Sequence, residues 1–161
     1  MKLFHASTCI IDKPDIFHSR DKLDFGRGFY LTTIYEQAVK YAERFTRRDI
    51  HAFINEYQLD DDISPFTIKT FPRYDSEWLD YVAICRKGLQ DNSIYDAVSG
   101  GIANDKVFNT IDLYFTGMIS KEEALGRLVY IRPNHQLCIL NNELLNLHLH
   151  FVNAIELDGS E

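Results

Sequence analysis

The sequence predicts an α+β fold in a single domain that spans residues 1–161. Segments rich in aromatic and β-branched residues alternate with segments of helical periodicity, but without the regular spacing of a doubly wound sheet. A hydrophobic share of 45% and an aromatic share of 13% supply one globular core, and 161 residues are too few to expect two domains. The chain contains no repeat, linker or low-complexity segment.

Charge and cysteine content exclude several classes of protein. The net charge of −7 argues against broad, unspecific binding to nucleic acid or membrane, although a local basic patch stays open. Three scattered cysteines indicate neither a disulfide framework nor a zinc site, and no metal is expected. No apolar run approaches a membrane span, so we expect a cytoplasmic protein without membrane contact. The residues that could form the basic patch are Arg44, Arg47, Arg48, Arg73, Arg86 and Lys87.

The stretch 24–41, DFGRGFYLTTIYEQAVKY, organises the prediction. Gly26 and Gly28 permit positive φ and a close approach of main chain to a ligand. A short strand is predicted over 29–31 and an amphipathic helix over 35–47, with Thr32 or Thr33 as its cap. Tyr30 would then stand where a loop opens beside a rigid helix. A tight turn with Tyr30 in the core is the other interpretation, since Gly-x-Gly alone is a weak signal.

The other elements follow from periodicity and stop signals. Ser76 is predicted to cap a helix that ends near Gly88, and Ser120 with Glu123 forms a capping box. The acidic run 60–62 is read as a solvated turn, because it lacks the spacing of a calcium loop. Strands are predicted over 2–5, 52–59, 66–71, 95–98, 136–140 and 151–157, and helices over 76–89, 106–115 and 121–128 with a short leucine-rich one after residue 140.

Three separated pieces of the chain share one resemblance. LFHAST ends with His5, Ala6 and Ser7, FGRGFYLTTIYEQAVKYA places Tyr41 eleven positions after Tyr30, and HQLCILNNELLNLHLHFV carries a later strand. In this order they resemble the diphtheria-toxin-like branch of the ADP-ribosyltransferases, which includes the poly(ADP-ribose) polymerases. DFGRGFYLTT and NDKVFNTI are most similar to small bacterial members thought to act as toxins or effectors, some with a neutralising partner.

The resemblance implies a split β-sheet with flanking helices and an NAD cleft between its halves. Tyr30 and Tyr41 would stack on the nicotinamide ring. The main chain at Ala6, where the family has Gly, would bind the carboxamide, with Ser7 beside it. His5 would donate to a ribose hydroxyl, although a strand-end histidine bonded to backbone is the alternative. The other residues expected at the NAD site are Arg20, Gly26, Arg27 and Gly28, of which the two arginines would meet the pyrophosphate unless they are solvated loop residues.

Gln136 stands where the family has its catalytic acid. An amide can orient a hydroxyl but cannot deprotonate it, so elongation of a polymer is not expected. Asp96 and Asp105, on either side of the glycine pair at 100–101, are candidates for the missing carboxylate, although Asp105 could simply cap the following helix. The catalytic residues implied are thus His5, Tyr30, Gln136 and Asp105.

The resemblance therefore implies an NAD-dependent mono-ADP-ribosyltransferase that uses NAD as co-substrate and no metal, and that modifies a protein or nucleic acid. It also implies a bacterial toxin with a small antitoxin protein as partner. Two alternatives stay open. One is an NAD glycohydrolase, in which water replaces the acceptor. The other is an inactive module that binds NAD or a partner, which the glutamine at position 136 favours and the retained His5, Tyr30 and Tyr41 oppose.

Overall fold

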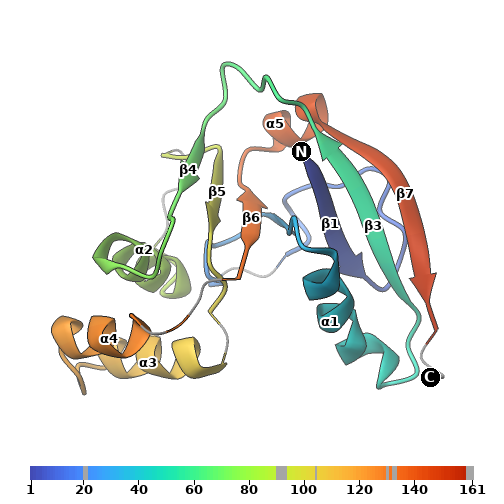
Figure 1. The fold of residues 1–161 in the computed structure, drawn as a ribbon. Coiled ribbons are helices and arrows are strands. Elements are labelled where there is room, and N and C mark those ends of the chain that lie inside the picture. Colours follow the sequence, from blue (N-terminus) through green and yellow to red (C-terminus); the bar gives the residue numbers. More distant parts are fainter. Residues whose placement is uncertain (20–21, 90–93, 104, 130, 132–133, 159–161) are drawn as a thin grey trace.

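The structure, a computed structural model, confirms the predicted α+β class (Figure 1). It describes residues 1–19, 22–89, 94–103, 105–129, 131 and 134–158. Within these residues it contains two β-sheets and five α-helices. The helices are α1 (Tyr35–Thr46), α2 (Ser76–Arg86), α3 (Asp105–Phe115), α4 (Lys121–Leu128) and α5 (Asn142–His148).

The strands divide into a three-stranded and a four-stranded sheet. The first sheet is antiparallel, in the order β1 (Lys2–Ser7), β3 (Ala52–Leu59), β7 (Leu149–Leu157). The second has the order β2 (Phe29–Leu31), β6 (Gln136–Ile139), β5 (Ala97–Gly100), β4 (Ile68–Thr70), and only its β4–β5 pair is parallel. In the second sheet β2, from the N-terminal part of the chain, thus lies beside β6 from the C-terminal part, whereas in the first sheet β3 separates β1 from β7.

The four-stranded sheet is buried on both faces. On one face Val98 and Cys138 pack against α2, α3 and α4, with Trp78, Val107 and Leu128 fully or almost fully buried. On the other face a second cluster joins β2, β5 and β6 to the three-stranded sheet and to α5. Figure 1 shows this order, with α2, α3 and α4 on one side of β4, β5 and β6, and β1, β3 and β7 on the other. The four-stranded sheet is therefore the central layer of the molecule.

Helix α1 packs on β1 and β3 of the three-stranded sheet. Its buried contact residues are the small Ala38 and Ala42, which lie in one cluster with Phe4 and Ile54, and the partly buried Tyr35, Val39 and Phe45 pack against this cluster. Small side chains let the helix backbone approach the sheet closely, which fixes its position relative to β1. Helical spacing alone would also allow Tyr41 to lie in this core. Its side chain is instead 47% exposed.

Several predicted boundaries and caps are corrected by the structure. Strand β1 continues two residues past His5 to Ser7, so His5 lies inside a strand and not at its end. The cap of α2 is Asp75, whose carboxylate accepts from the Trp78 amide at 3.0 Å, and not Ser76. Helix α1 begins after Ile34, and no side chain caps it. Ser120 caps α4 as predicted, since its hydroxyl accepts from the Glu123 amide at 3.1 Å, but the Glu123 carboxylate accepts from Arg127 at 2.9 Å and supplies no reciprocal bond of a capping box.

The acidic turn at 60–62 is tied to β7. The Asp60 carboxylate lies 2.9 Å from His148 Nδ1 and 3.0 Å from His150 Nε2. Among the described residues, no group of three or more His, Cys, Asp or Glu side chains is arranged to hold a metal ion. In the same part of the chain no helix has both the length and the apolar character needed to cross a membrane.

Gly101 should be intolerant of a side chain. A Cβ there would lie 2.6 to 2.9 Å from atoms of the Tyr74 ring. That ring cannot retreat freely, because its hydroxyl donates to the Ile102 carbonyl at 2.6 Å and its face packs on Trp78. Gly101→Ala should therefore lower the free energy of unfolding by about 1–3 kcal/mol in a urea titration.

The matched control is Gly126→Ala in α4, where a Cβ meets nothing within 4 Å. Because alanine is the better helix former, this variant should gain up to about 1 kcal/mol. Equal stability of the two variants would contradict the packing described for Gly101.

Candidate functional site

Among the described residues, one β-bridge joins the two sheets, between Phe4 of β1 and Thr32, the residue that follows β2. The Phe4 amide donates to the Thr32 carbonyl at 2.8 Å, and the Thr32 amide donates to the Phe4 carbonyl at 2.9 Å. Within the described part of the chain, the flanking residues of β1 and β2 form no further backbone pair with one another, so the strands separate beyond this point. We call the region beyond the bridge, bounded by His5, Ala6 and Tyr30, the strand junction.

Backbone geometry directs polar groups into the strand junction. Along a strand, the N–H and C=O groups of alternate residues point to the same side. The N–H and C=O of Phe4 point toward β2, so those of Ala6, two residues on, also point toward β2. In the same way, the N–H and C=O of Thr32 point toward β1, so those of Tyr30 also point toward β1. Within the described residues the Ala6 groups have no hydrogen-bond partner. The junction therefore offers one free donor and one free acceptor from Ala6.

His5 occupies the junction from the β1 side. Its Nδ1 lies 2.6 Å from the Tyr30 carbonyl, and its ring stacks on Phe29 with 4.4 Å between centroids. Since a carbonyl can only accept, Nδ1 carries the proton, and in the neutral ring Nε2 is left as an acceptor. Burial lowers the pKa of His5, and the bond to the Tyr30 carbonyl offsets part of this effect. His5 is thus bonded to backbone through Nδ1, as one of the two sequence interpretations expects, and in the neutral ring its Nε2 is an acceptor and not a donor.

Asn55 of β3 holds the end of β1 in place. It is fully buried, its Nδ2 donates to the His5 carbonyl (3.2 Å) and the Ser7 hydroxyl (3.0 Å), and its Oδ1 accepts from the Ile11 amide (2.9 Å). The Ser7 hydroxyl is in turn bonded to the Cys9 carbonyl. The predicted NAD-site residue Ser7 is therefore used to shape the loop that follows β1. Sequence reasoning missed Asn55, because a lone Asn inside a strand carries no motif.

The two glycines of the loop before β2, Gly26 and Gly28, are required for different structural reasons. Gly26 has a φ of +79°, as expected for a position that requires glycine. A Cβ at Gly28 would lie 2.5 Å from Cys138 Sγ and 2.6 Å from the Ile139 carbonyl. The close approach predicted at Gly28 is therefore an approach to β6, and the Gly28 amide donates to Ser19 Oγ at 3.0 Å.

Tyr30 is anchored at its hydroxyl. The hydroxyl donates to the Gly26 carbonyl at 2.5 Å and accepts from the Phe25 amide at 3.1 Å. Burial raises the pKa of this phenol well above its ordinary value, so the group stays neutral and is no proton carrier near neutral pH. The partly buried ring packs beside the cluster that includes Cys138. Tyr30 therefore ties the glycine loop to β2.

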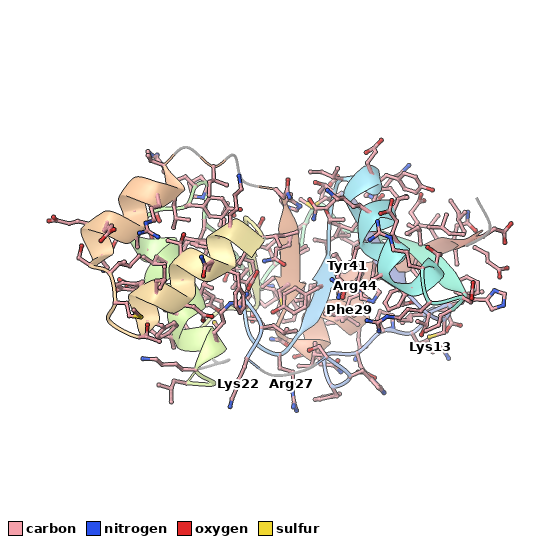
Figure 2. All side chains as sticks on the ribbon, turned by 90° about the horizontal axis from the view of Figure 1, so that it is seen from below. Lys13, Lys22, Arg27, Phe29, Tyr41 and Arg44 are labelled. Atoms are coloured by element: carbon pink, nitrogen blue, oxygen red, sulfur yellow. The ribbon has the colours of Figure 1, made fainter. Side chains whose placement is uncertain are left out.

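Tyr41 and Arg27 are solvent-facing. The Arg44 guanidinium lies over the Tyr41 ring, 3.8 Å from its centroid, and Phe45 packs against the ring edge. Figure 2 shows Tyr41 and Arg44 together on α1, while Arg27 and Lys22 project from the loop that precedes β2. A ring in this position can stack on a ligand once Arg44 moves aside. Arg20, the other arginine expected near the pyrophosphate, lies outside the described residues.

Gln136, at the start of β6, is directed into the protein. Its Nε2 donates to Asp24 Oδ2 at 3.2 Å and to the Gly101 carbonyl at 3.3 Å, and the residue is only 7% exposed. Asp24 also accepts from the Ala103 amide at 2.9 Å and forms an ion pair with Arg86. The carboxylate nearest to Gln136 is thus Asp24, which sequence reasoning did not single out although it opens the central stretch.

The structure does not place either of the carboxylates predicted from the sequence, those of Asp96 and Asp105, in contact with Gln136. Asp96 accepts from the Thr67 amide (3.0 Å) and from Asn141 Nδ2 (2.9 Å), and it precedes Ala97, which pairs with Ile139. Gln136 pairs with Gly100 at the opposite end of β5. The structure thus corrects the expectation that Asp96 could serve Gln136. Asp105 is the first residue of α3, but its side chain lies outside the described residues.

His135 is a further residue that the sequence did not indicate. Its Nδ1 accepts from the Thr33 amide at 3.3 Å, and its Nε2 lies 3.1 Å from Ser99 Oγ. Because Nδ1 accepts, the proton is on Nε2 and is donated to Ser99. Burial lowers the pKa of His135, which favours this neutral form. His135 therefore links Thr33, which follows β2, to Ser99 of β5. It is not a base that could activate the Ser99 hydroxyl as a nucleophile.

Fold and site together define a mixed α+β protein whose two sheets meet at a partly unpaired strand junction. Residues 1–151 match the model of a family described as a protein of unknown function (DUF3990), and the chain belongs to this family. Comparison with curated proteins and with solved structures gives no significant match.

The lowered pKa of His5 should make the protein less stable in mild acid. In the unfolded chain His5 takes up a proton near pH 6.5, whereas in the folded protein it takes up the proton only at lower pH. The free energy of unfolding is therefore highest above about pH 6.5 and decreases as the pH falls below that value. The loss is about 1.4 kcal/mol for each unit by which folding lowers the pKa. His5→Gln should flatten the dependence of unfolding free energy on pH between about 6.5 and 5.

His135 contributes in the same direction, so part of the slope should survive in the His5→Gln variant. The control is His18→Gln, which removes an imidazole whose side chain is 88% exposed. A slope in His5→Gln equal to that of the wild-type protein would contradict the neutral state assigned to His5.

Proposed function

We propose that the protein is an NAD-dependent mono-ADP-ribosyltransferase that binds the nicotinamide end of NAD at the strand junction. The observation that carries the proposal is the unpaired backbone of Ala6. A carboxamide needs one donor and one acceptor at the same place, and a free strand edge supplies both without a side chain. The substitution of the family's Gly by Ala at this position leaves these backbone groups in place.

The residues around the junction can supply the remaining contacts. His5 Nε2 can accept from a ribose hydroxyl, and Tyr41 is exposed on the helix that the Phe4–Thr32 bridge brings to the junction. Stacking of an aromatic ring on nicotinamide costs little entropy, because tyrosine has only two side-chain torsions. Arg27, exposed on the glycine loop, is available for the pyrophosphate, since arginine pairs with phosphate oxygens by two bonds.

The proposed reaction follows the usual chemistry of glycosyl transfer. The bond between the nicotinamide nitrogen and the ribose C1′ breaks, and nicotinamide leaves with the electron pair. The acceptor nucleophile then forms a bond to the same carbon and gives its proton to solvent, because the Gln136 amide cannot take it. The charge that develops on the ribose must be stabilised by fixed dipoles and by negative charge near the site. We infer a single transfer and no polymer.

The acceptor in this proposal is a protein or a nucleic acid. We further propose, from the resemblance to small bacterial toxins, that the protein acts in the cytoplasm as a toxin and that a small antitoxin protein neutralises it. A net charge of −7 disfavours a long nucleic-acid footprint, so a protein or a short nucleic-acid segment fits better.

A second candidate is a module that binds NAD without transferring ADP-ribose. The specific observation in its favour is that position 136 holds an amide, which cannot act as a base, and that the carboxylate beside it, Asp24, is bonded to Arg86, the Ala103 amide and Gln136. NAD glycohydrolase activity lies between the two, because water would then take the place of the macromolecular acceptor.

Tyr41 offers the clearest test of the proposed transfer, since its side chain is exposed and its substitution leaves the buried core unchanged. NAD labelled on its adenylate phosphate is incubated with the protein and a cell lysate. Tyr41→Ala should lower label transfer about ten-fold, as expected for the loss of one stacking contact of about 1–1.5 kcal/mol. Tyr41→Phe keeps the ring and should label at close to the wild-type rate.

Digestion of the labelled lysate identifies the acceptor. Label that protease removes and nuclease leaves indicates a protein, and the reverse indicates a nucleic acid. Free ADP-ribose without a labelled macromolecule would replace the transferase with a glycohydrolase. Neither product, together with NAD binding by the wild-type protein, would refute an enzyme and leave the binding module.

A further inference from the structure

The orientation of the Gln136 side-chain amide is fixed by its neighbours. Its nitrogen faces Asp24 Oδ2 at 3.2 Å and the Gly101 carbonyl at 3.3 Å. Both partners are oxygens without a proton to give, so only the NH₂ end of the amide can face them. Both amide hydrogens are therefore used inside the protein, and Oε1 is the atom left for any other contact.

Gln136 Oε1 is free to accept. No described residue donates a hydrogen bond to this oxygen. Among the described residues, Arg86 Nε is the one fully buried side-chain polar atom without a hydrogen-bond partner, so Gln136 Oε1 is not fully buried. The oxygen is therefore reached by solvent, although the residue as a whole is 7% exposed. Inverting the amide would place this oxygen against the Asp24 carboxylate, and the repulsion between two acceptors prevents that.

Asp24 is held firmly enough to impose this orientation. It is 8% exposed, its Oδ1 pairs with the Arg86 guanidinium, and its Oδ2 accepts from the Ala103 amide at 2.9 Å as well as from Gln136. Arg86 is itself covered by Phe108, whose ring centroid lies 4.2 Å from the guanidinium carbon. The carboxylate behind Nε2 also polarises the amide, which makes Oε1 a stronger acceptor.

We propose that Asp24 is a positioning residue that sets the polarity of Gln136, so that position 136 presents a carbonyl oxygen that accepts from a neutral donor of the ligand. This inference deepens the proposed function and rests on it for the identity of the ligand. The donor would be a hydroxyl of the nicotinamide ribose. A phosphate is excluded at this oxygen, because two acceptors repel one another.

The first test asks whether the contact between positions 24 and 136 exists, and it needs no ligand. Gln136→Glu places a second carboxyl beside Asp24, and two carboxylates this close cannot both ionise easily. The introduced carboxyl holds its proton more tightly in the folded state, so stability is complete below its ordinary pKa of about 4.3 and is lost as the pH rises. The urea midpoint of Gln136→Glu should therefore fall, relative to wild type, between about pH 4 and 7.

Exchanging the two groups should remove that fall. The double variant, Asp24→Asn with Gln136→Glu, keeps one carboxyl and one amide in contact, and its midpoint should follow the wild-type pH dependence. The other titratable groups near this contact are unchanged in all of these variants; they are Arg86, Tyr30, Tyr74, Cys85 and Cys138. Gln58→Glu, the same charge change at an exposed position of β3, is the control. A Gln136→Glu midpoint that tracks this control would overturn the contact.

The second test measures binding of NAD by calorimetry. Asp24→Asn frees the amide to invert and should weaken NAD about ten-fold, as for the loss of one good hydrogen bond. The exchanged pair should recover binding to within about three-fold of wild type, because the carboxyl at 136 accepts in either orientation. If Asp24 served only as the partner of Arg86, NAD binding would stay weak in the double variant Asp24→Asn with Gln136→Glu, because that variant still lacks the Asp24 carboxylate.

The outcomes separate the two proposals. Exchanged-pair binding as weak as that of Asp24→Asn, or Asp24→Asn binding equal to wild type, would overturn the positioning role. NAD that fails to bind the wild-type protein would overturn the proposed function and the ribose with it, while the pH comparison would still decide whether Asp24 controls position 136.

Discussion

The bridge between Phe4 and Thr32 is the interaction on which the site depends. It joins two sheets that otherwise pack through side chains, and it does so with a pair of backbone hydrogen bonds. Because the strands separate immediately beyond it, the bridge determines which backbone groups stay unpaired. The Thr32 hydroxyl also accepts from the Ile34 amide at 3.1 Å, just before α1 begins. One contact thus positions the strand edge and the helix that carries Tyr41.

A second constraint is the burial of the four-stranded sheet on both faces. Side chains on β2 and β6 must alternate between two apolar clusters, so Tyr30 and Cys138 face the helices while Phe29 and Leu137 face the other sheet. Polar groups survive in such a layer only when they are bonded. This is why the Tyr30 hydroxyl, the Gln136 amide and the Asp24 carboxylate all have partners within the protein.

Local features of the fold could be predicted from the sequence, because they depend on neighbours along the chain. The bounds of β3, the Ser120 cap of α4 and the positive φ of Gly26 are confirmed. Features that depend on distant residues could not. Gly28 is small because Cys138 lies against it, and Tyr41 is exposed although other residues of α1, among them Ala38 and Ala42, pack on the sheet. Likewise Asp24, Asn55 and His135 carry no local signal, since their partners come from other elements.

The hydrogen bonds of Asp24 also bear on how the chain acquires its folded form. Its partners Arg86, Ala103 and Gln136 follow it by 62, 79 and 112 residues. Contacts between such distant positions form late, because the intervening chain must first be closed into loops. During synthesis the glycine loop leaves the ribosome long before β6 does. The site is therefore assembled only when nearly the whole polypeptide has been made, and a nascent or C-terminally truncated chain lacks it.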